Sequence, residues 1–156
     1  MRLLGIDPGT GILGFGVIDM VNSQPHLVTA GVIKTPPHTP LDERLEEIYD
    51  NLCNIITETK PTTVSIEKLF FARNVTTAMS VAHARGVAML ACKKARLTIA
   101  EYTPLEIKQT LTGYGKADKK QVQEMVRLQL RLREVPRPDD AADALAAAIT
   151  HALMAR

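Results

Sequence analysis

Cysteine is scarce in this 156-residue chain, and tryptophan is missing altogether. The two cysteines, Cys53 and Cys92, form no close-spaced motif, which argues against a zinc site and against a disulfide framework. The four histidines form no cluster that could act as a catalytic set. This cysteine usage is typical of a reducing compartment, so we expect a cytoplasmic protein.

Long hydrophobic runs are lacking as well. No apolar segment approaches the ~20 residues that a transmembrane helix needs. The first residues reach an acidic side chain at Asp7, too early for a signal peptide. With no internal repeat and no low-complexity segment, the chain length predicts one domain over residues 1–156.

The net charge is small, at +2, and by itself it says little about a nucleic-acid partner. Its distribution is more informative. Residues 108–138 carry eight basic and three acidic side chains, a local net charge of +5, whereas residues 41–59 carry six acidic side chains and one basic. One basic and one acidic side suit a polyanion docking on one face, although a solvated helix face of mixed charge gives the same pattern.

Three apolar segments with turn residues between them open the chain. Residues 3–7, 13–19 and 26–35 read as strands, separated by turn signals at 9–11 and 22–25. Because the connections are short, we expect these strands to be antiparallel neighbours. The rest of the chain alternates helical and strand patterns: helix 41–59, strand 62–67, helix 74–96, strand 97–101, and helices starting at 103, 118 and 139. This order predicts an α/β fold with a mixed five-stranded sheet flanked by α-helices.

Helix starts carry recognisable capping residues. Thr39 and Thr103 are predicted N-caps, with Pro40 and Pro104 at the first helical position. Asp139 is best explained as a cap of the last helix.

The predicted helix 74–96 is unusually rich in small residues, with alanine, serine, threonine and glycine at nine positions between residues 76 and 91. Such a helix lets another element approach closely. Its small face is either a dimer seam, which we favour, or only a contact within the chain.

Four acidic residues follow or open the elements that the pattern predicts. Asp7 and Glu67 each end an apolar strand, and Asp140 and Asp143 share one face of the last helix. Each has an ordinary explanation alone, since acids are common in turns and near helix N-termini. Asp143 is harder to dismiss, because an acid on an alanine-rich buried helix needs a partner.

Taken together, these acids predict a hard-cation site built of oxygen ligands. Mg²⁺ favours such sites, and two-metal phosphodiester sites hold their ions ~3.5–4 Å apart. Asp7 is expected to bridge the metals, because its short strand is the rigid centre of the set. The neighbouring pair Phe70 and Phe71 suggests that one ring is in the core and the other stacks on an exposed base.

The sequence resembles the RuvC-type Holliday-junction resolvases, which are bacterial crossover junction endodeoxyribonucleases with a ribonuclease-H-like fold. The likeness covers essentially the whole chain. It rests on residues 5–9 (Gly-Ile-Asp-Pro-Gly), Ile66-Glu67 with Phe70, Gln109-Thr110, Gln121-Val122, and residues 140–146 (Asp-Ala-Ala-Asp-Ala-Leu-Ala).

The resemblance implies roles for particular residues. Asp7, Glu67, Asp140 and Asp143 would be the catalytic, metal-binding carboxylates; Phe70, Lys108 and Lys119 would contact DNA, with Lys116 and Lys120 as weaker candidates. Asp139 is assigned no role in the site. The implied cofactor is Mg²⁺, two ions in each site, with Mn²⁺ able to substitute.

The implied reaction is resolution of a four-way junction in recombination and repair. A homodimer would make paired, symmetric nicks in opposed strands, leaving 3′-hydroxyl and 5′-phosphate ends. RuvA- and RuvB-type branch-migration proteins are the implied partners. Two alternatives are weaker: an actin-like ATPase fragment, for which the chain is too short, and a silent junction-binding module, which would have lost its acids.

Overall fold

The computed structural model describes residues 1–68 and 75–155. Its centre is a twisted sheet of five strands in the order β3-β2-β1-β4-β5. β1 pairs antiparallel with β2 and parallel with β4, so the sheet is mixed, as the sequence predicts. The strands are β1 (Arg2–Asp7), β2 (Ile12–Val21), β3 (Gln24–Lys34), β4 (Thr63–Glu67) and β5 (Thr98–Tyr102).

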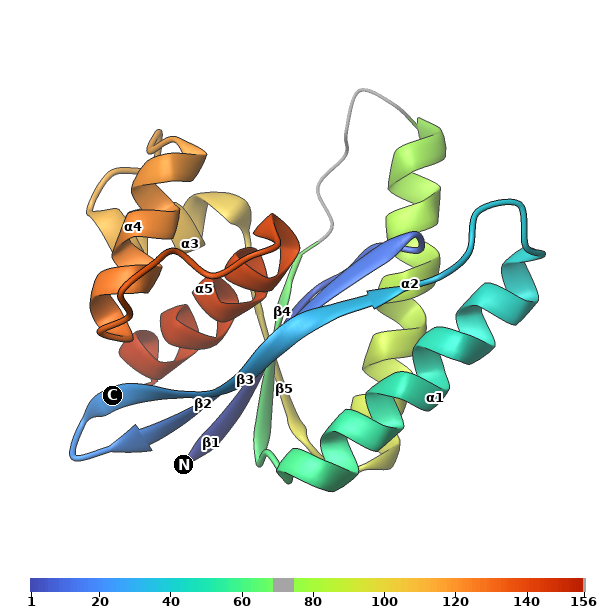
Figure 1. Cartoon of the computed structure of the whole chain (residues 1–156), viewed down its shortest axis with the longest axis horizontal. Coiled ribbons are helices and arrows are strands. Elements are labelled where there is room, and N and C mark those ends of the chain that lie inside the picture. The colour runs from blue at the N-terminus through green and yellow to red at the C-terminus, as the bar shows by residue number, and fades with distance from the viewer. Residues whose placement is uncertain (69–74, 156) are drawn as a thin grey trace.

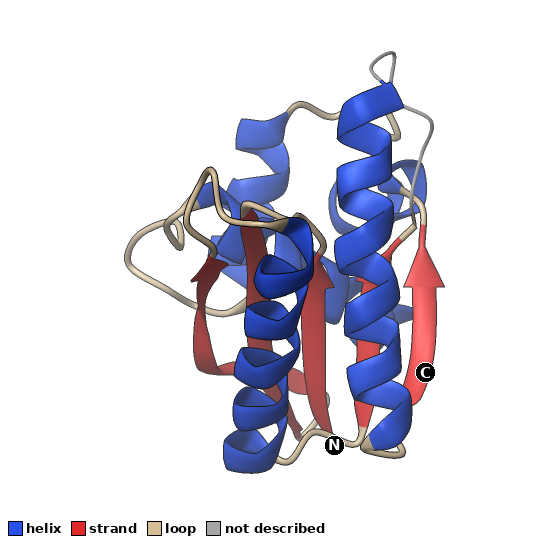
Figure 2. Ribbon diagram, turned by 90° about the vertical axis from the view of Figure 1, so that its right-hand side faces the viewer, coloured by secondary structure: helices blue, strands red, loops and turns tan. Residues whose placement is uncertain are grey.

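Helices cover both faces of this sheet. Figure 1 shows α1 and α2 on one face and α3, α4 and α5 on the other, and Figure 2 views the sheet through the two long helices of the first group. Among the described residues, no helix combines the length and hydropathy that crossing a membrane requires. The helices are α1 (Leu41–Thr59), α2 (Val75–Lys94), α3 (Pro104–Thr112), α4 (Lys119–Gln129) and α5 (Asp139–Met154).

The predicted helix starts have mixed outcomes. Thr103 caps α3 in a full capping box with Glu106, and Pro104 holds the first position, as predicted. The prediction for Thr39 is wrong: Pro40 is the N-cap, because its ψ of 143° is extended and the helix begins only at Leu41. The prediction for Asp139 is also wrong, since Pro138 is the N-cap of α5 and makes no side-chain cap bond.

The two sheet faces are packed with different side chains. Leu4, Ile6 and Val64 point toward α1 and α2, where they pack with large aliphatic residues such as Ile48 and Leu52. Leu3 and Ile18 point the other way and pack against a largely alanine surface on α5. Because side chains alternate along a strand, Asp7 shares the α5 face with Leu3 and Gly5.

Glycines on the α5 face let the helix backbone lie almost directly on the sheet. A Cβ added to Gly5 would lie 1.9 Å from the Ala144 carbonyl oxygen, and one added to Gly14 would lie 2.0 Å from that of Asp140. No side chain fits at either position. Glycine within a strand often marks such a close backbone approach.

Three of the small residues of α2 are used within the chain. Ala84, Ala88 and Ala91 are buried in the core beneath it, and α2 packs against α1. The intramolecular contact that the sequence allowed is therefore present. Its opposite side is exposed, with Val75, Met79 and Leu90 each more than half accessible.

Candidate active site

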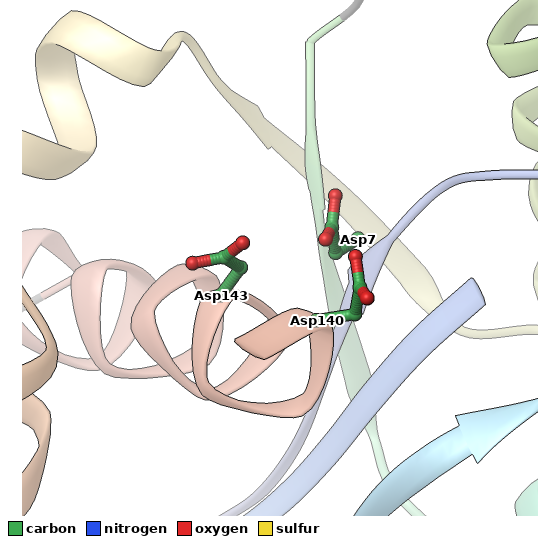
Figure 3. A group of neighbouring side chains, drawn as sticks. All are labelled: Asp7, Asp140 and Asp143. Atoms are coloured by element: carbon green, nitrogen blue, oxygen red, sulfur yellow. The ribbon is translucent and has the colours of Figure 1, made fainter. Parts of the chain in front are cut away.

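Three of the four predicted carboxylates meet at one end of the sheet. Asp7 comes from the end of β1, and Asp140 and Asp143 from the first turns of α5 (Figure 3). One carboxylate oxygen from each lies within 4.8 Å of those of the other two. Residues separated by more than 130 positions in the sequence thus form one cluster.

The glycine contacts place this cluster. Asp7 pairs with Gly14 in the β1–β2 register, and it is Gly14 that the Asp140 carbonyl overlies. Further along α5, the buried Ser65 hydroxyl of β4 donates a hydrogen bond of 2.7 Å to the Ala147 carbonyl. Together, these contacts hold the helix in fixed register on β1, β2 and β4.

The electrostatics of the cluster are unfavourable for three free anions. The pKa of Asp7 is raised to about 8, chiefly by burial and further by the charges of Glu67, Asp143 and Asp140. Burial also raises the pKa of Asp143, against the opposing effect of Lys119. Crowded, desolvated carboxylates of this kind are stabilised by a bound cation.

Glu67 lies beside the cluster but outside the tight trio of Asp7, Asp140 and Asp143. It ends β4, the strand parallel to β1, so both acids emerge at the same edge of the sheet. Burial raises the pKa of Glu67, as does the charge of Asp143. The fourth predicted carboxylate is therefore within electrostatic reach of Asp7 and Asp143.

Lys119 is the predicted DNA-contacting base that touches a carboxylate of the cluster. Its ammonium nitrogen lies 3.7 Å from Asp143 and 3.2 Å from Asp139. Asp139 also accepts a hydrogen bond of 3.1 Å from the Gln123 side chain. Burial lowers the pKa of Lys119, but Asp143, Asp139 and Asp140 outweigh that effect and raise it.

A cavity of about 310 Å³ opens beside these groups. The charged residues Glu67, Asp143, Lys108 and Lys119 all line it, and its apolar lining includes Ile107, Val122 and Ala146. The structure therefore places Lys108 and Lys119 in the same cavity as two of the acids, and their contact with DNA stays a prediction. Lys116 and Lys120 are exposed, and Phe70 and Phe71 lie outside the described residues.

The donor set fits a hard divalent cation. Carboxylate oxygens are the ligands that Mg²⁺ prefers, and the trio offers one from each of three aspartates within a space that an ion could share. Asp7, Asp140 and Asp143 could hold it.

Sequence reasoning missed the residues that place the acids. Gly5 and Gly14 have no chemistry of their own, and their signal was the presence of glycine inside strand patterns. The contact from Asp139 to Lys119 was also missed, because α4 and α5 meet only in the folded chain.

Comparisons with known proteins agree with this geometry. The family model described as crossover junction endodeoxyribonuclease RuvC matches residues 3–151. The RuvC of Brevibacillus brevis is 53% identical over 152 residues, covering 97% of this chain and 92% of that protein.

Solved structures give the same result. T. thermophilus RuvC in complex with a Holliday junction substrate superposes with a TM-score of 0.94 at 39% identity, covering 100% of this chain and 95% of that one. The yeast mitochondrial Holliday junction resolvase Ydc2 shares the fold, with a TM-score of 0.67 at 12% identity over 96% of this chain and 78% of its own. The expected ribonuclease-H-like fold of the resolvases is confirmed, and the chain belongs to the RuvC family of crossover junction endodeoxyribonucleases.

Proposed function

We propose that this chain resolves Holliday junctions by Mg²⁺-dependent hydrolysis of phosphodiester bonds in two opposed strands. The observation that carries the proposal is the convergence of Asp7, Asp140 and Asp143 within 4.8 Å. Family membership supports the nuclease activity, and the junction-bound T. thermophilus relative supports the substrate. The products would be 3′-hydroxyl and 5′-phosphate ends that a ligase can join.

The carboxylates would act as the metal ligands. Asp7, Asp140 and Asp143 would hold one ion, and Glu67 would help to hold a second. Held by these residues, Mg²⁺ would supply activation of the attacking water and stabilisation of the charge on the leaving oxygen. Mn²⁺ offers the same preference for oxygen ligands.

The two lysines at the cavity would bind and orient the scissile phosphate. Lys108 and Lys119 line the cavity that Glu67 and Asp143 also line. A phosphate bound in this cavity would meet the positive charge of both lysines next to the acids that would hold the metal. Phe70 remains a proposed junction contact, carried by the resemblance alone.

Paired nicks require two active sites, which supports a homodimer. A four-way junction is close to two-fold symmetric, so a two-fold symmetric protein places identical sites on equivalent strands. We propose α2 as the contact. Its exposed stripe of Val75, Met79 and Leu90 is apolar, and Gly86 on the same helix has no atom within 4 Å of an added Cβ. A mid-helix glycine costs roughly 0.5–1 kcal/mol, and a close partner helix would explain it.

A substitution in this stripe tests the dimer. Leu90→Glu should convert a dimer to monomers in light scattering and abolish paired nicks, while leaving single nicks. The same change at another exposed apolar residue, Leu128→Glu on α4, is the matched control and should leave the dimer intact. A Leu90→Glu protein that stays dimeric would rule out this interface.

The remaining parts of the proposal follow from the family. Residues 1–156 would act as one nuclease domain in the cytoplasm, on junctions delivered by RuvA- and RuvB-type branch-migration proteins.

The decisive experiment compares a synthetic mobile four-way junction with a linear duplex of the same sequence. We expect symmetric, ligatable nicks only in the junction and only with Mg²⁺, not with chelator. Asp7→Asn should abolish cutting and leave junction binding intact. Binding without nicks across several core sequences and metals would instead support a silent binding module.

A further inference from the structure

We propose that Tyr114 forms a nucleobase-stacking site at the rim of the active-site cavity. Four aromatic residues lie in the described part of the chain, and Tyr114 alone among them is exposed, at 55%. Phe15, Tyr49 and Tyr102 are partly buried and pack against the two core clusters. The Tyr114 ring is therefore not accounted for by the core.

The loop that carries Tyr114 leads directly into the cavity. It joins α3 to α4 on the α5 side of the sheet (Figure 1). The Tyr114 carbonyl accepts a hydrogen bond of 3.1 Å from the backbone of Ala117. Ala117, Asp118 and Lys119 line the same cavity as Glu67 and Asp143. A base stacked on Tyr114 would thus belong to a nucleotide close to the proposed scissile phosphate.

Hydrogen bonds hold this loop in a defined shape. Gly113 ends α3 at a φ of 76°, and the Gln109 side chain donates to its carbonyl at 3.0 Å. The Tyr114 backbone N–H donates to the Thr112 hydroxyl at 3.0 Å. The ring is therefore presented from an ordered turn, which lowers the entropic cost of binding.

The surroundings of Tyr114 match a nucleic-acid strand. The Leu105 side chain, which is 61% exposed, lies against the loop: a Cβ added to Gly115 would be 2.6 Å from the Leu105 Cδ1 atom. An apolar surface therefore continues beside the loop. Lys116 and Lys120 are exposed nearby in the sequence, and Lys108 and Lys119 line the cavity. Aromatic rings among basic side chains are the recurring pattern of single-strand binding, because a ring stacks on any base while lysines meet the phosphates.

The ligand is an unpaired nucleobase of the junction, and this step rests on the proposed function. A four-way junction offers such bases when its centre is opened, whereas a linear duplex keeps its bases stacked. Tyr114 would therefore favour the junction over the duplex.

The absence of tryptophan from the chain allows a direct test. Tyr114→Trp creates a single-tryptophan protein, and stacking on a base should quench its emission when the synthetic four-way junction is added in an Asp7→Asn background. Val28→Trp is the matched reporter: Val28 is exposed on β3, toward the sheet end away from Asp7, and its emission should not change. Equal responses from the two reporters would overturn the proposal.

Affinity measurements separate stacking from a structural role. Tyr114→Phe should bind the junction like the unchanged chain, whereas Tyr114→Leu, which keeps apolar surface without a π face, should raise Kd by about 5- to 150-fold. In the cutting-competent chain, Tyr114→Leu should raise the junction concentration for half-maximal nicking and leave the rate at saturation nearly unchanged. If the Tyr114→Leu and Tyr114→Phe proteins bind the junction with equal affinity, stacking is refuted while the nuclease proposal stands. A chain that binds no junction would refute both.

Discussion

The two faces of the central sheet are built on different principles. Under α1 and α2, large side chains such as Ile48 and Leu52 fill the space between helix and strands. Under α5, glycines bring the helix backbone onto the sheet, with no room for a Cβ at Gly5 or Gly14. Interdigitated side chains can adjust by changing rotamers, whereas a backbone in direct contact cannot.

This difference explains where the carboxylates lie. Asp140 and Asp143 reach Asp7 only because α5 sits at a fixed height and register on β1 and β2. The α1–α2 face chiefly supplies stability, and the α5 face supplies position. Substitutions on the two faces should therefore separate loss of stability from loss of catalysis.

The largest expected effect is at the cluster itself. Asp143→Asn should lower the rate of junction nicking at least about a thousandfold, because metal assistance is worth several kcal/mol and each 1.36 kcal/mol is tenfold in rate. Single-turnover nicking measures the effect. A chain that still cuts within about tenfold of the original rate would show that Asp143 is not a ligand.

The comparison of the two faces is tested next by Gly14→Ala and Ile48→Ala. The added methyl at Gly14 would lie 2.0 Å from the Asp140 carbonyl, so α5 must shift, and misplacement by about 1 Å can cost about a hundredfold in rate. Ile48→Ala should lose about 2–5 kcal/mol of unfolding free energy and keep the nicking rate of the folded protein.

Urea unfolding and nicking per folded molecule check both variants. The idea of a positioning face and a stabilising face fails if Ile48→Ala reduces the folded protein's rate as much as Gly14→Ala does.

The pH dependence of stability should differ between Asp7, whose pKa is raised, and Asp19, whose pKa is lowered. The folded chain holds the pKa of Asp7 at about 8, above its ordinary value of 3.8. In the pH window between these two pKa values, the folded state binds more protons than the unfolded state. Metal-free protein should therefore lose stability as pH rises through the window. Asp7→Asn should stabilise it by about 1–3 kcal/mol more at pH 8 than at pH 5, after allowance for solvent screening.

Unfolding in chelator at the two pH values measures this effect, and Mg²⁺ should remove most of it. Asp19 gives the opposite control. Its hydrogen bonds from Arg2 lower the pKa of its carboxyl, so Asp19→Asn should destabilise the protein at both pH values. If Asp7→Asn changes the free energy of unfolding equally at pH 5 and at pH 8, the pKa of Asp7 is not raised in the folded chain.

The smallest effect is expected at Asp139, which holds Lys119 from an exposed position. Exposed ion pairs are worth up to about 1 kcal/mol, so Asp139→Ala should slow nicking at most about fivefold. Asp42→Ala is the matched change, in the first turn of α1 on the other face, and should have no effect. A loss as large as that of Asp143→Asn would make Asp139 part of the metal site.

Much of the fold was predictable because local patterns and global structure agree. Apolar segments with turn residues between them identified the first three strands, and Thr103 with Pro104 identified the start of α3. Predictions failed where local signals were ambiguous. Thr39 and Pro40 would suit either of two capping registers, and the backbone angles of Pro40 decided between them.

By itself, the sequence determined which acids could act, since strand ends and the first turns of a helix place Asp7, Glu67, Asp140 and Asp143 at or near element boundaries. Only the tertiary structure decided that Asp7, Asp140 and Asp143 meet within 4.8 Å, and that Asp139 holds Lys119. The reason is physical. Periodicity acts over a few residues, whereas the height of α5 depends on whether distant strands carry a Cβ beneath it.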